Sequence, residues 1–326
     1  MRELLSVVVP LYNETGSLEE LYEQLRGVLE GLQLDFEVIF VDDGSRDDSF
    51  AVVAKLVERD NRVRGIQLSR NFGHQLAISA GLDAARGDAV VVMDADLQHP
   101  PATVAAFVAK WRDGYDVVYG VMVGRQSPRL SKRLLSAAYY RLLRRLTPID
   151  VPLGAGDFRL IDRKAVDVVN QMRERNRYLR GMVSWIGFEQ TGVDYTVGER
   201  YAGRSSYSLG RMVRFARDGI FSFSDLPLRL ILNVGFIVSF LSIAFGVSAI
   251  AARATDALTV PGWASLAVAV SFIGGLQLIV LGMVGEYVGR IYDEVKQRPL
   301  YVINSLVGFS PRDPETSTRG PDHACG

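Results

Sequence analysis

Residues 89–98 read AVVVMDADLQ, and the fold class is predicted from this pattern and its repetition along the chain. A short β-branched run that ends in acidic residues is typical of a buried strand followed by a loop. Similar apolar runs lie at 5–9 (LSVVV) and 36–41 (FEVIFV), and further ones near 65–68 and 115–120. Segments with helical spacing separate them, so the sequence predicts an α/β fold with a mainly parallel sheet.

The helical signals are local and specific. Ser17 and Glu20 have the spacing of a capping box, and Leu18, Leu21 and Leu25 then recur at helical spacing. Further helices are expected up to about residue 57, near 74–85 and after Pro101.

The composition excludes several classes of protein. The chain has 326 residues, 48% of them hydrophobic, and 37 basic residues balance 37 acidic ones. A net charge of zero argues against a general nucleic-acid binder. The single cysteine, Cys325, excludes an internal disulfide framework and a cysteine-based zinc site. The N-terminus turns polar too soon for a signal peptide.

Two uncharged stretches follow the α/β part, at 230–252 and 257–285. Each exceeds the roughly 20 residues that span a bilayer as a helix. They predict a transmembrane hairpin with helices at about 230–252 and 262–286 in a cytoplasmic (inner or plasma) membrane. Basic residues flank both outer ends, so the positive-inside rule puts these flanks in the cytosol.

The sequence therefore divides into four parts. We expect a cytosolic domain at 1–228, two membrane helices within 229–289, a cytosolic return segment at 290–310 and a disordered tail at 311–326.

A basic segment without acidic residues lies between 117 and 149. Its pattern predicts an amphipathic helix at about 129–146 on an anionic membrane surface, and 208–224 is a weaker candidate of the same kind. The alternative is a charged, solvated face packed on its own domain.

Acidic clusters follow three predicted strands, in PLYNE (10–14), at Asp42 and Asp43, and in DAD (94–96). Ligands of such sheets bind at the carboxyl ends of the strands, so the clusters should meet at one edge. The usual glycine-rich dinucleotide and phosphate loops are absent. Asp94 and Asp96 could instead hold a divalent metal against a pyrophosphate, because carboxylates suit hard cations. Solvated turns are the alternative reading of these clusters.

Four motifs together resemble the family 2 glycosyltransferases of GT-A fold: VPLYNE (9–14), VDDGS (41–45), SRNFG (69–73) and MDADLQ (93–98). The chain more narrowly resembles polyprenyl-phosphate glycosyltransferases such as dolichyl-phosphate mannose synthases, bactoprenol glucosyltransferases and undecaprenyl-phosphate aminoarabinose transferases. VGEYVGR (284–290) is similar to the latter two groups. The resemblance spans about residues 5–305 and implies a Rossmann-like GT-A domain.

The resemblance implies an inverting transfer of a sugar from a nucleotide-sugar, UDP-glucose or a related UDP-hexose, to polyprenyl (undecaprenyl) phosphate. It also implies Mg²⁺ or Mn²⁺ as cofactor and a homo-oligomer, with a tetramer as one form. The residues that would bind the nucleotide are Pro10, Tyr12, Asn13, Glu14, Asp42, Asp43, Asp94 and Ala95.

The resemblance assigns the remaining roles as follows. Asp94 and Asp96 would hold the metal, and Asp157 and Asp96 would be the catalytic carboxylates. Because a phosphate monoester is mostly dianionic at neutral pH, with a second pKa near ~6, Asp157 need not be a strong base. The residues that would bind the lipid phosphate or the diphosphate are Arg200, Arg204, Ser205, Arg129, Lys132 and Arg133. Ser206 stands where the family commonly has lysine.

Two alternatives stay open. A processive polysaccharide synthase shares the acidic clusters, but its Q-x-x-R-W signature is absent from this sequence. The other is a non-catalytic membrane protein: a sugar-nucleotide sensor would not need Asp94 and Asp96, and two helices make a poor lipid pathway for a flippase component unless they oligomerise. Metal-dependent turnover would exclude both. His74 and His99 could touch phosphates, although a single histidine is more often structural.

Overall fold

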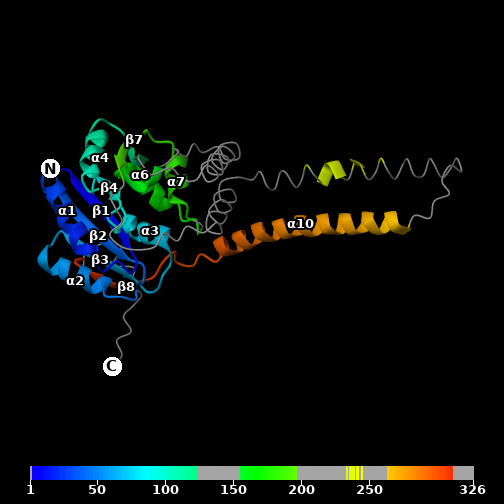
Figure 1. Ribbon diagram of the computed structural model, residues 1–326, viewed down its shortest axis with the longest axis horizontal. Coiled ribbons are helices and arrows are strands. Elements are labelled where there is room, and N and C mark those ends of the chain that lie inside the picture. Colours follow the sequence, from blue (N-terminus) through cyan, green and yellow to red (C-terminus); the bar gives the residue numbers. More distant parts are fainter. Residues whose placement is uncertain are drawn as a thin grey trace, which may run out of the picture. The chain divides into compact units, whose positions relative to one another are not determined.

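The computed structural model describes residues 2–123, 155–175, 177–196 and 263–310, with a few helical positions between 233 and 244 (Figure 1). The chain divides into two compact units, Met1–Gly219 with Pro299–Gly326, and Ile220–Arg298.

The first unit is built on one sheet of eight strands in the order β7-β5-β6-β4-β1-β2-β3-β8. β1 pairs in parallel with β2 and β4, β2 with β3, and β5 with β7. β6 is antiparallel to β4 and β5, and β8 is antiparallel to β3. The predicted mainly parallel α/β sheet is confirmed. The strands are β1 (Leu4–Leu11), β2 (Asp35–Asp42), β3 (Val63–Leu68), β4 (Ala89–Val92), β5 (Val117–Val123), β6 (Ala155–Asp162), β7 (Gln190–Thr196) and β8 (Ile303–Val307).

Helices cover both faces of this sheet (Figure 1). α1, α2 and α4 share one hydrophobic core with the sheet, while α3 packs on the other face against β1 and β2, next to α6, which also contacts α7. The helices of this unit are α1 (Leu18–Glu30), α2 (Ser49–Arg59), α3 (His74–Ala84), α4 (Thr103–Arg112), α6 (Arg163–Gln171) and α7 (Leu179–Trp185).

The central strands are apolar because both of their faces are covered. In β1, Val7 and Val9 belong to the core under α1 and α4, whereas Val8 meets α3 on the opposite face. All three valines are fully buried. This continuous β-branched burial is typical of parallel strands between helical layers.

The capping box predicted at the start of α1 does not form the hydrogen bond expected of Ser17. Ser17 stands at the N-cap, but its side chain accepts no hydrogen bond from the helix. Its hydroxyl instead donates to the carbonyl oxygen of Glu14 at 3.1 Å. The Ser17 side chain therefore stabilises the turn before the helix rather than the first helical N–H groups.

The last strand of the sheet comes from residues 303–307, near the end of the described chain. β8 extends the edge next to β3, and the Tyr301 hydroxyl donates to Asp83 Oδ2 at 2.7 Å. Asn304 donates to Gln67 at 3.0 Å. The predicted return segment at 290–310 therefore has two parts. Residues 290–295 are helical, and residues 303–307 form a strand of the sheet.

The second unit contains α10 (Trp263–Val295). By length and composition its stretch Phe272–Val295 could cross a membrane, and an 18-residue window of it has a mean hydropathy of 1.5. The helix continues to Val295, beyond the membrane boundary predicted at about 286, and an ion pair of 3.1 Å between Glu286 and Arg290 supports its last turns. The predicted first membrane helix at 230–252 lies mostly outside the described residues, and the tail at 311–326 and the basic segments at 129–146 and 208–224 lie wholly outside them.

Close packing of α3 on β1 gives a testable prediction. A Cβ atom at Gly81 would lie 2.2 Å from Val8 Cγ1, so Gly81→Ala should lower the free energy of unfolding by about 1–3 kcal/mol. Gly27→Ala in α1 is the matched control, because nothing lies within 4 Å of its new methyl group. That variant should be more stable by roughly 0.5–1 kcal/mol. Denaturant unfolding of the solubilised chain measures both, and equal stabilities would contradict the packing of α3.

Candidate active site

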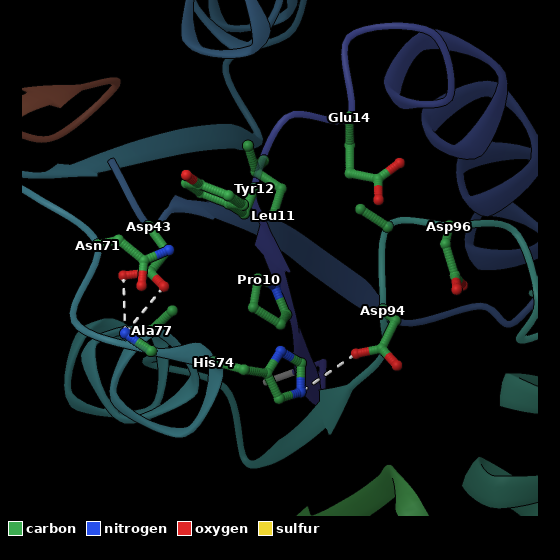
Figure 2. A pocket seen from close by; sticks show the side chains of 12 residues that line it. Pro10, Leu11, Tyr12, Glu14, Asp43, Asn71, His74, Ala77, Asp94 and Asp96 are labelled. Atoms are coloured by element: carbon green, nitrogen blue, oxygen red, sulfur yellow. Dashed lines mark hydrogen bonds and ion pairs between the residues drawn. The ribbon is translucent and has the colours of Figure 1, made fainter. Parts of the chain in front are cut away.

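A pocket of about 320 Å³ lies at the carboxyl ends of β1, β2 and β4 (Figure 2). The three predicted acidic clusters each contribute to it, so their convergence at one sheet edge is confirmed. Its lining residues are Pro10, Leu11, Tyr12, Glu14, Asp43, Asn71, Gly73, His74, Ala77, Asp94, Ala95 and Asp96.

The two neighbouring aspartates after β2 have different environments. Asp42 is fully buried, and its Oδ1 accepts from the Ser45 N–H at 2.9 Å. Asp43 lines the pocket and accepts from the N–H groups of Phe72 and Gly73 at 2.7 and 2.9 Å. Burial raises the pKa of Asp43, and the hydrogen bonds from these two N–H groups offset only part of that rise. Asp43 thus holds the turn that leads into α3, while Asp42 shapes the turn after β2.

The loop after β1 is fixed by polar contacts to the loop after β2. Asn13 has a φ of 56°, its N–H donates to Ser45 Oγ, and its Oδ1 accepts from the Arg46 N–H, both at 2.9 Å. The Glu14 N–H donates to Ser49 Oγ at 2.9 Å. Asn13 therefore joins the two loops and is absent from the pocket lining, whereas Pro10, Tyr12 and Glu14 line the pocket.

The D-x-D segment places two carboxylates on the pocket wall. The Asp94 N–H donates to Nδ1 of His99 at 3.1 Å, and the His99 ring stacks on Phe158 with centroids 4.7 Å apart. His99 is thus structural, as expected for a single histidine. Asp96 Oδ1 accepts from the Gln98 N–H at 3.1 Å.

One carboxylate oxygen of this segment has no hydrogen-bond donor. Asp94 Oδ1 is buried and accepts no hydrogen bond. Burial raises the pKa of Asp94, because His74 and His99 only partly offset the loss of water. An unsatisfied hard oxygen beside a second carboxylate fits a divalent cation. No group of three or more acidic, His or Cys side chains among the described residues forms a complete metal site, so a metal would need further ligands from a substrate or water.

His74, the first residue of α3, points toward Asp94 (Figure 2), and a second carboxylate, that of Asp157, also lies near its ring. Its Nε2 lies 3.4 Å from Asp94 Oδ1 and 3.7 Å from Asp157 Oδ2. Burial lowers the pKa of His74, but the contact with Asp157 and the charge of Asp94 outweigh burial and raise the pKa to about 9. His74 therefore carries a positive charge between two acids at neutral pH.

Asp157, on β6, is the carboxylate that the family resemblance singled out. Gln75 Nε2 donates to its Oδ2 at 3.0 Å, and Arg180 Nη2 approaches its Oδ1 at 3.5 Å. Burial raises the pKa of Asp157, but the contact with His74 and the charge of Arg180 outweigh it and hold the pKa well below its usual range. Asp157 is consequently ionised and a weak base.

Gln75 and Arg180 were not predicted as site residues from the sequence. His74 was named only as a histidine that could touch phosphates. His74 follows directly after the SRNFG motif, which could have marked it, whereas no pattern marks Gln75 or Arg180. The remaining predicted residues lie outside the described residues, namely Arg129, Lys132, Arg133, Arg200, Arg204, Ser205 and Ser206.

Comparisons with known proteins identify the family of this chain. A family model described as "Glycosyl transferase family 2" matches residues 6–169. The uncharacterized glycosyltransferase sll0501 of Synechocystis is 43% identical, covering 94% of this chain and 96% of its own. The SfII prophage-derived bactoprenol glucosyl transferase of Shigella flexneri is 36% identical, over 92% of this chain and 97% of its own. Glucosyl-3-phosphoglycerate synthase of Mycobacterium tuberculosis, solved with Mn²⁺, UDP and phosphoglyceric acid, is 20% identical with a TM-score of 0.44, over 66% of this chain and 75% of its own.

The chain belongs to glycosyl transferase family 2. It is therefore a glycosyltransferase with a GT-A domain, and the pocket at the carboxyl ends of its central strands is its candidate active site.

The turn after β2 gives a testable prediction. Gly44 has a φ of +69°, and a Cβ atom there would lie 2.5 Å from the backbone carbon of Arg70. Gly44→Ala should push the 70–73 turn away and weaken nucleoside diphosphate binding by roughly tenfold or more, about 1.4 kcal/mol. Calorimetric titration with UDP and with GDP measures this.

Gly16→Ala is the control, because nothing lies within 4 Å of the added methyl group and its φ is not positive. Wild-type affinity of Gly44→Ala for both nucleotides would show that this turn does not form part of the nucleotide site.

Proposed function

We propose that the protein is a membrane-bound, inverting hexosyltransferase that moves a sugar from a UDP-sugar, UDP-glucose first, to polyprenyl phosphate. The observation that carries this proposal is the pair Asp94 and Asp96 on the wall of the pocket, one oxygen of which lacks a donor. The bactoprenol glucosyl transferases, which match over nearly their whole length, support the lipid acceptor.

In this proposal the nucleotide lies along the loops after β1 and β2. Pro10, Tyr12 and Glu14 line that side of the pocket, and Tyr12 offers an aromatic ring that is 40% exposed. Asp43 lies beside them but also holds the Phe72 and Gly73 N–H groups. Asn13 and Asp42 would act on the nucleotide through the turns that they fix, and Ala95 would lie against it.

Asp94 and Asp96 would hold Mg²⁺ or Mn²⁺. Mg²⁺ is commonly bound by one or two carboxylates together with substrate phosphates, which suits a site with only two such side chains among the described residues. When bound, the metal would neutralise charge on the departing diphosphate. The residues of the chain itself would orient the donor, and His74 would add a positive charge beside Asp94.

The environment of Asp157 favours an acceptor that is already ionised. Its Oδ2 accepts a hydrogen bond from Gln75, and Arg180 stands next to its Oδ1. Such a carboxylate is a poor base for a sugar hydroxyl, whereas a phosphate monoester is mostly dianionic at neutral pH. Asp157 would therefore position the acceptor or stabilise positive charge at the reacting carbon.

A lipid acceptor also accounts for an apolar helix on an enzyme whose donor is water-soluble. Phe272–Val295 of α10 could anchor the chain in the bilayer. A second helix at 230–252, an active site facing the cytosol and a homo-oligomer belong to the same proposal. So do the basic segment with Arg129, Lys132 and Arg133, and the loop with Arg200, Arg204 and Ser205, as contacts for lipid or diphosphate phosphates.

The central test is a donor screen. Membranes that contain the protein are incubated with undecaprenyl phosphate, Mg²⁺ or Mn²⁺ and one labelled UDP- or GDP-sugar at a time. Label should enter the lipid extract from a UDP-hexose, and both EDTA and Asp96→Asn should abolish it. Label in long polysaccharide would favour a synthase. Nucleotide binding without turnover on any donor would favour a sensor.

The two kinds of carboxylate should behave differently on substitution. Asp94→Asn and Asp96→Asn should each abolish turnover, because the diphosphate would leave without its counter-charge. Asp157→Asn should retain measurable turnover, reduced by roughly 10²–10⁴-fold, because the acceptor needs no deprotonation. Initial rates across a range of pH values measure this. A complete loss in Asp157→Asn at every pH would contradict the weak-base role.

A further inference from the structure

Gln75 connects three elements that meet behind the pocket. It is the second residue of α3, Asp157 lies on β6, and Leu179 begins α7. The Gln75 Nε2 donates to Asp157 Oδ2 at 3.0 Å, and its Oε1 accepts from the Leu179 N–H at 3.1 Å. One amide group thus bridges residues that are 82 and 104 positions away in the sequence.

These two contacts fix the orientation of the amide. A backbone N–H can only donate and an ionised carboxylate can only accept, so an amide turned by 180° would lose both hydrogen bonds. The N-terminal N–H groups of a helix need acceptors, and Tyr178, the N-cap of α7, supplies no side-chain acceptor. Gln75 therefore has only one favourable arrangement between Asp157 and α7.

The same arrangement brings Arg180 to Asp157. Arg180 follows Leu179 directly, and its Nη2 lies 3.5 Å from Asp157 Oδ1. Gln75 consequently acts on Asp157 in two ways, through its own hydrogen bond to Oδ2 and through the position of the helix that carries Arg180.

We propose that Gln75 is a positioning residue for sugar transfer, which holds the Asp157 carboxylate in its productive orientation without touching either substrate. This inference rests on the proposed function, in which Asp157 faces the acceptor. The other contact of Asp157 with α3 is His74, which lies 3.7 Å from Asp157 Oδ2 and is shared with Asp94. Loss of the Gln75 amide would leave the carboxylate free to rotate toward His74.

Three variants separate the contacts. Gln75→Leu removes both hydrogen bonds at similar side-chain volume. Gln75→Glu keeps an acceptor for the Leu179 N–H but offers a carboxylate, and no donor, to Asp157. Gln190→Leu is the matched control, because Gln190 Nε2 donates to the Val183 carbonyl at 2.9 Å and so tethers the other end of α7 without meeting Asp157.

We expect Gln75→Leu and Gln75→Glu to lower kcat by roughly ten- to a hundredfold, since a misplacement of about 1 Å costs that much, with little change in KM for the donor. Gln190→Leu should stay close to wild type. In an Asp157→Asn background, Gln75→Leu should lower kcat by no more than about threefold further, because residues that act as a unit are not additive. A near-wild-type Gln75→Glu, or a fully additive double variant, would overturn the inference.

A second measurement keeps this test separate from that of the proposed function. The contact itself can be tested by the melting temperatures of the solubilised full chain. The shift of the Gln75→Leu/Asp157→Asn double variant should differ from the sum of the two single shifts by roughly 2 °C or more. If the wild-type protein transfers no sugar to polyprenyl phosphate but this coupling is present, the proposed function fails and the Gln75 contact stands. Additive melting temperatures would overturn the contact.

Discussion

The parallel register of β1 with its two neighbours is the constraint on which the rest of the structure depends. Leu11 pairs with Asp42, so β1 and β2 end at the same level, and Val8 pairs with Val92, so β4 ends three residues earlier beside them. The ladder is buried under helices on both faces, and its buried polar pair Ser6 and Glu37 is hydrogen-bonded at 2.6 Å, whereas the acidic pocket side chains follow at the carboxyl ends. The loops after β1, β2 and β4 therefore face one another, and the pocket follows from the pairing of the strands.

Such a pocket gathers acidic side chains that repel one another, and the structure offsets this repulsion in different ways. Asp43 accepts two backbone N–H groups, and Asp157 is held by Gln75 and Arg180. His74 lies between Asp157 and Asp94. Asp94 alone among them keeps a buried oxygen without a donor. A cation at the D-x-D segment would give this oxygen the ligand contact that no hydrogen-bond donor supplies.

The sequence predicted what local patterns encode. The β-branched runs and their acidic ends indicated the parallel strands and the shared pocket, because those signals lie within a few residues of one another. Contacts between distant segments could not be predicted in this way. The antiparallel pairing of β6, the link from Gln75 to Asp157 and the addition of β8 each depend on partners far away in the chain. Ser17 shows a subtler limit, since the residue type was right for a cap, but its hydroxyl donates to the Glu14 carbonyl instead of accepting from the first helical N–H groups.

The pairing of β8 with β3 makes the apolar unit an insertion within the sheet domain rather than an appendage to its end. During synthesis, the outer edge of β3 stays unpaired until the ribosome has made every residue up to 307. An open strand edge is a site of mispairing between chains. Completion of the catalytic domain is consequently tied to the synthesis of the whole apolar segment, so a chain that stops within that segment also lacks the last strand of its sheet.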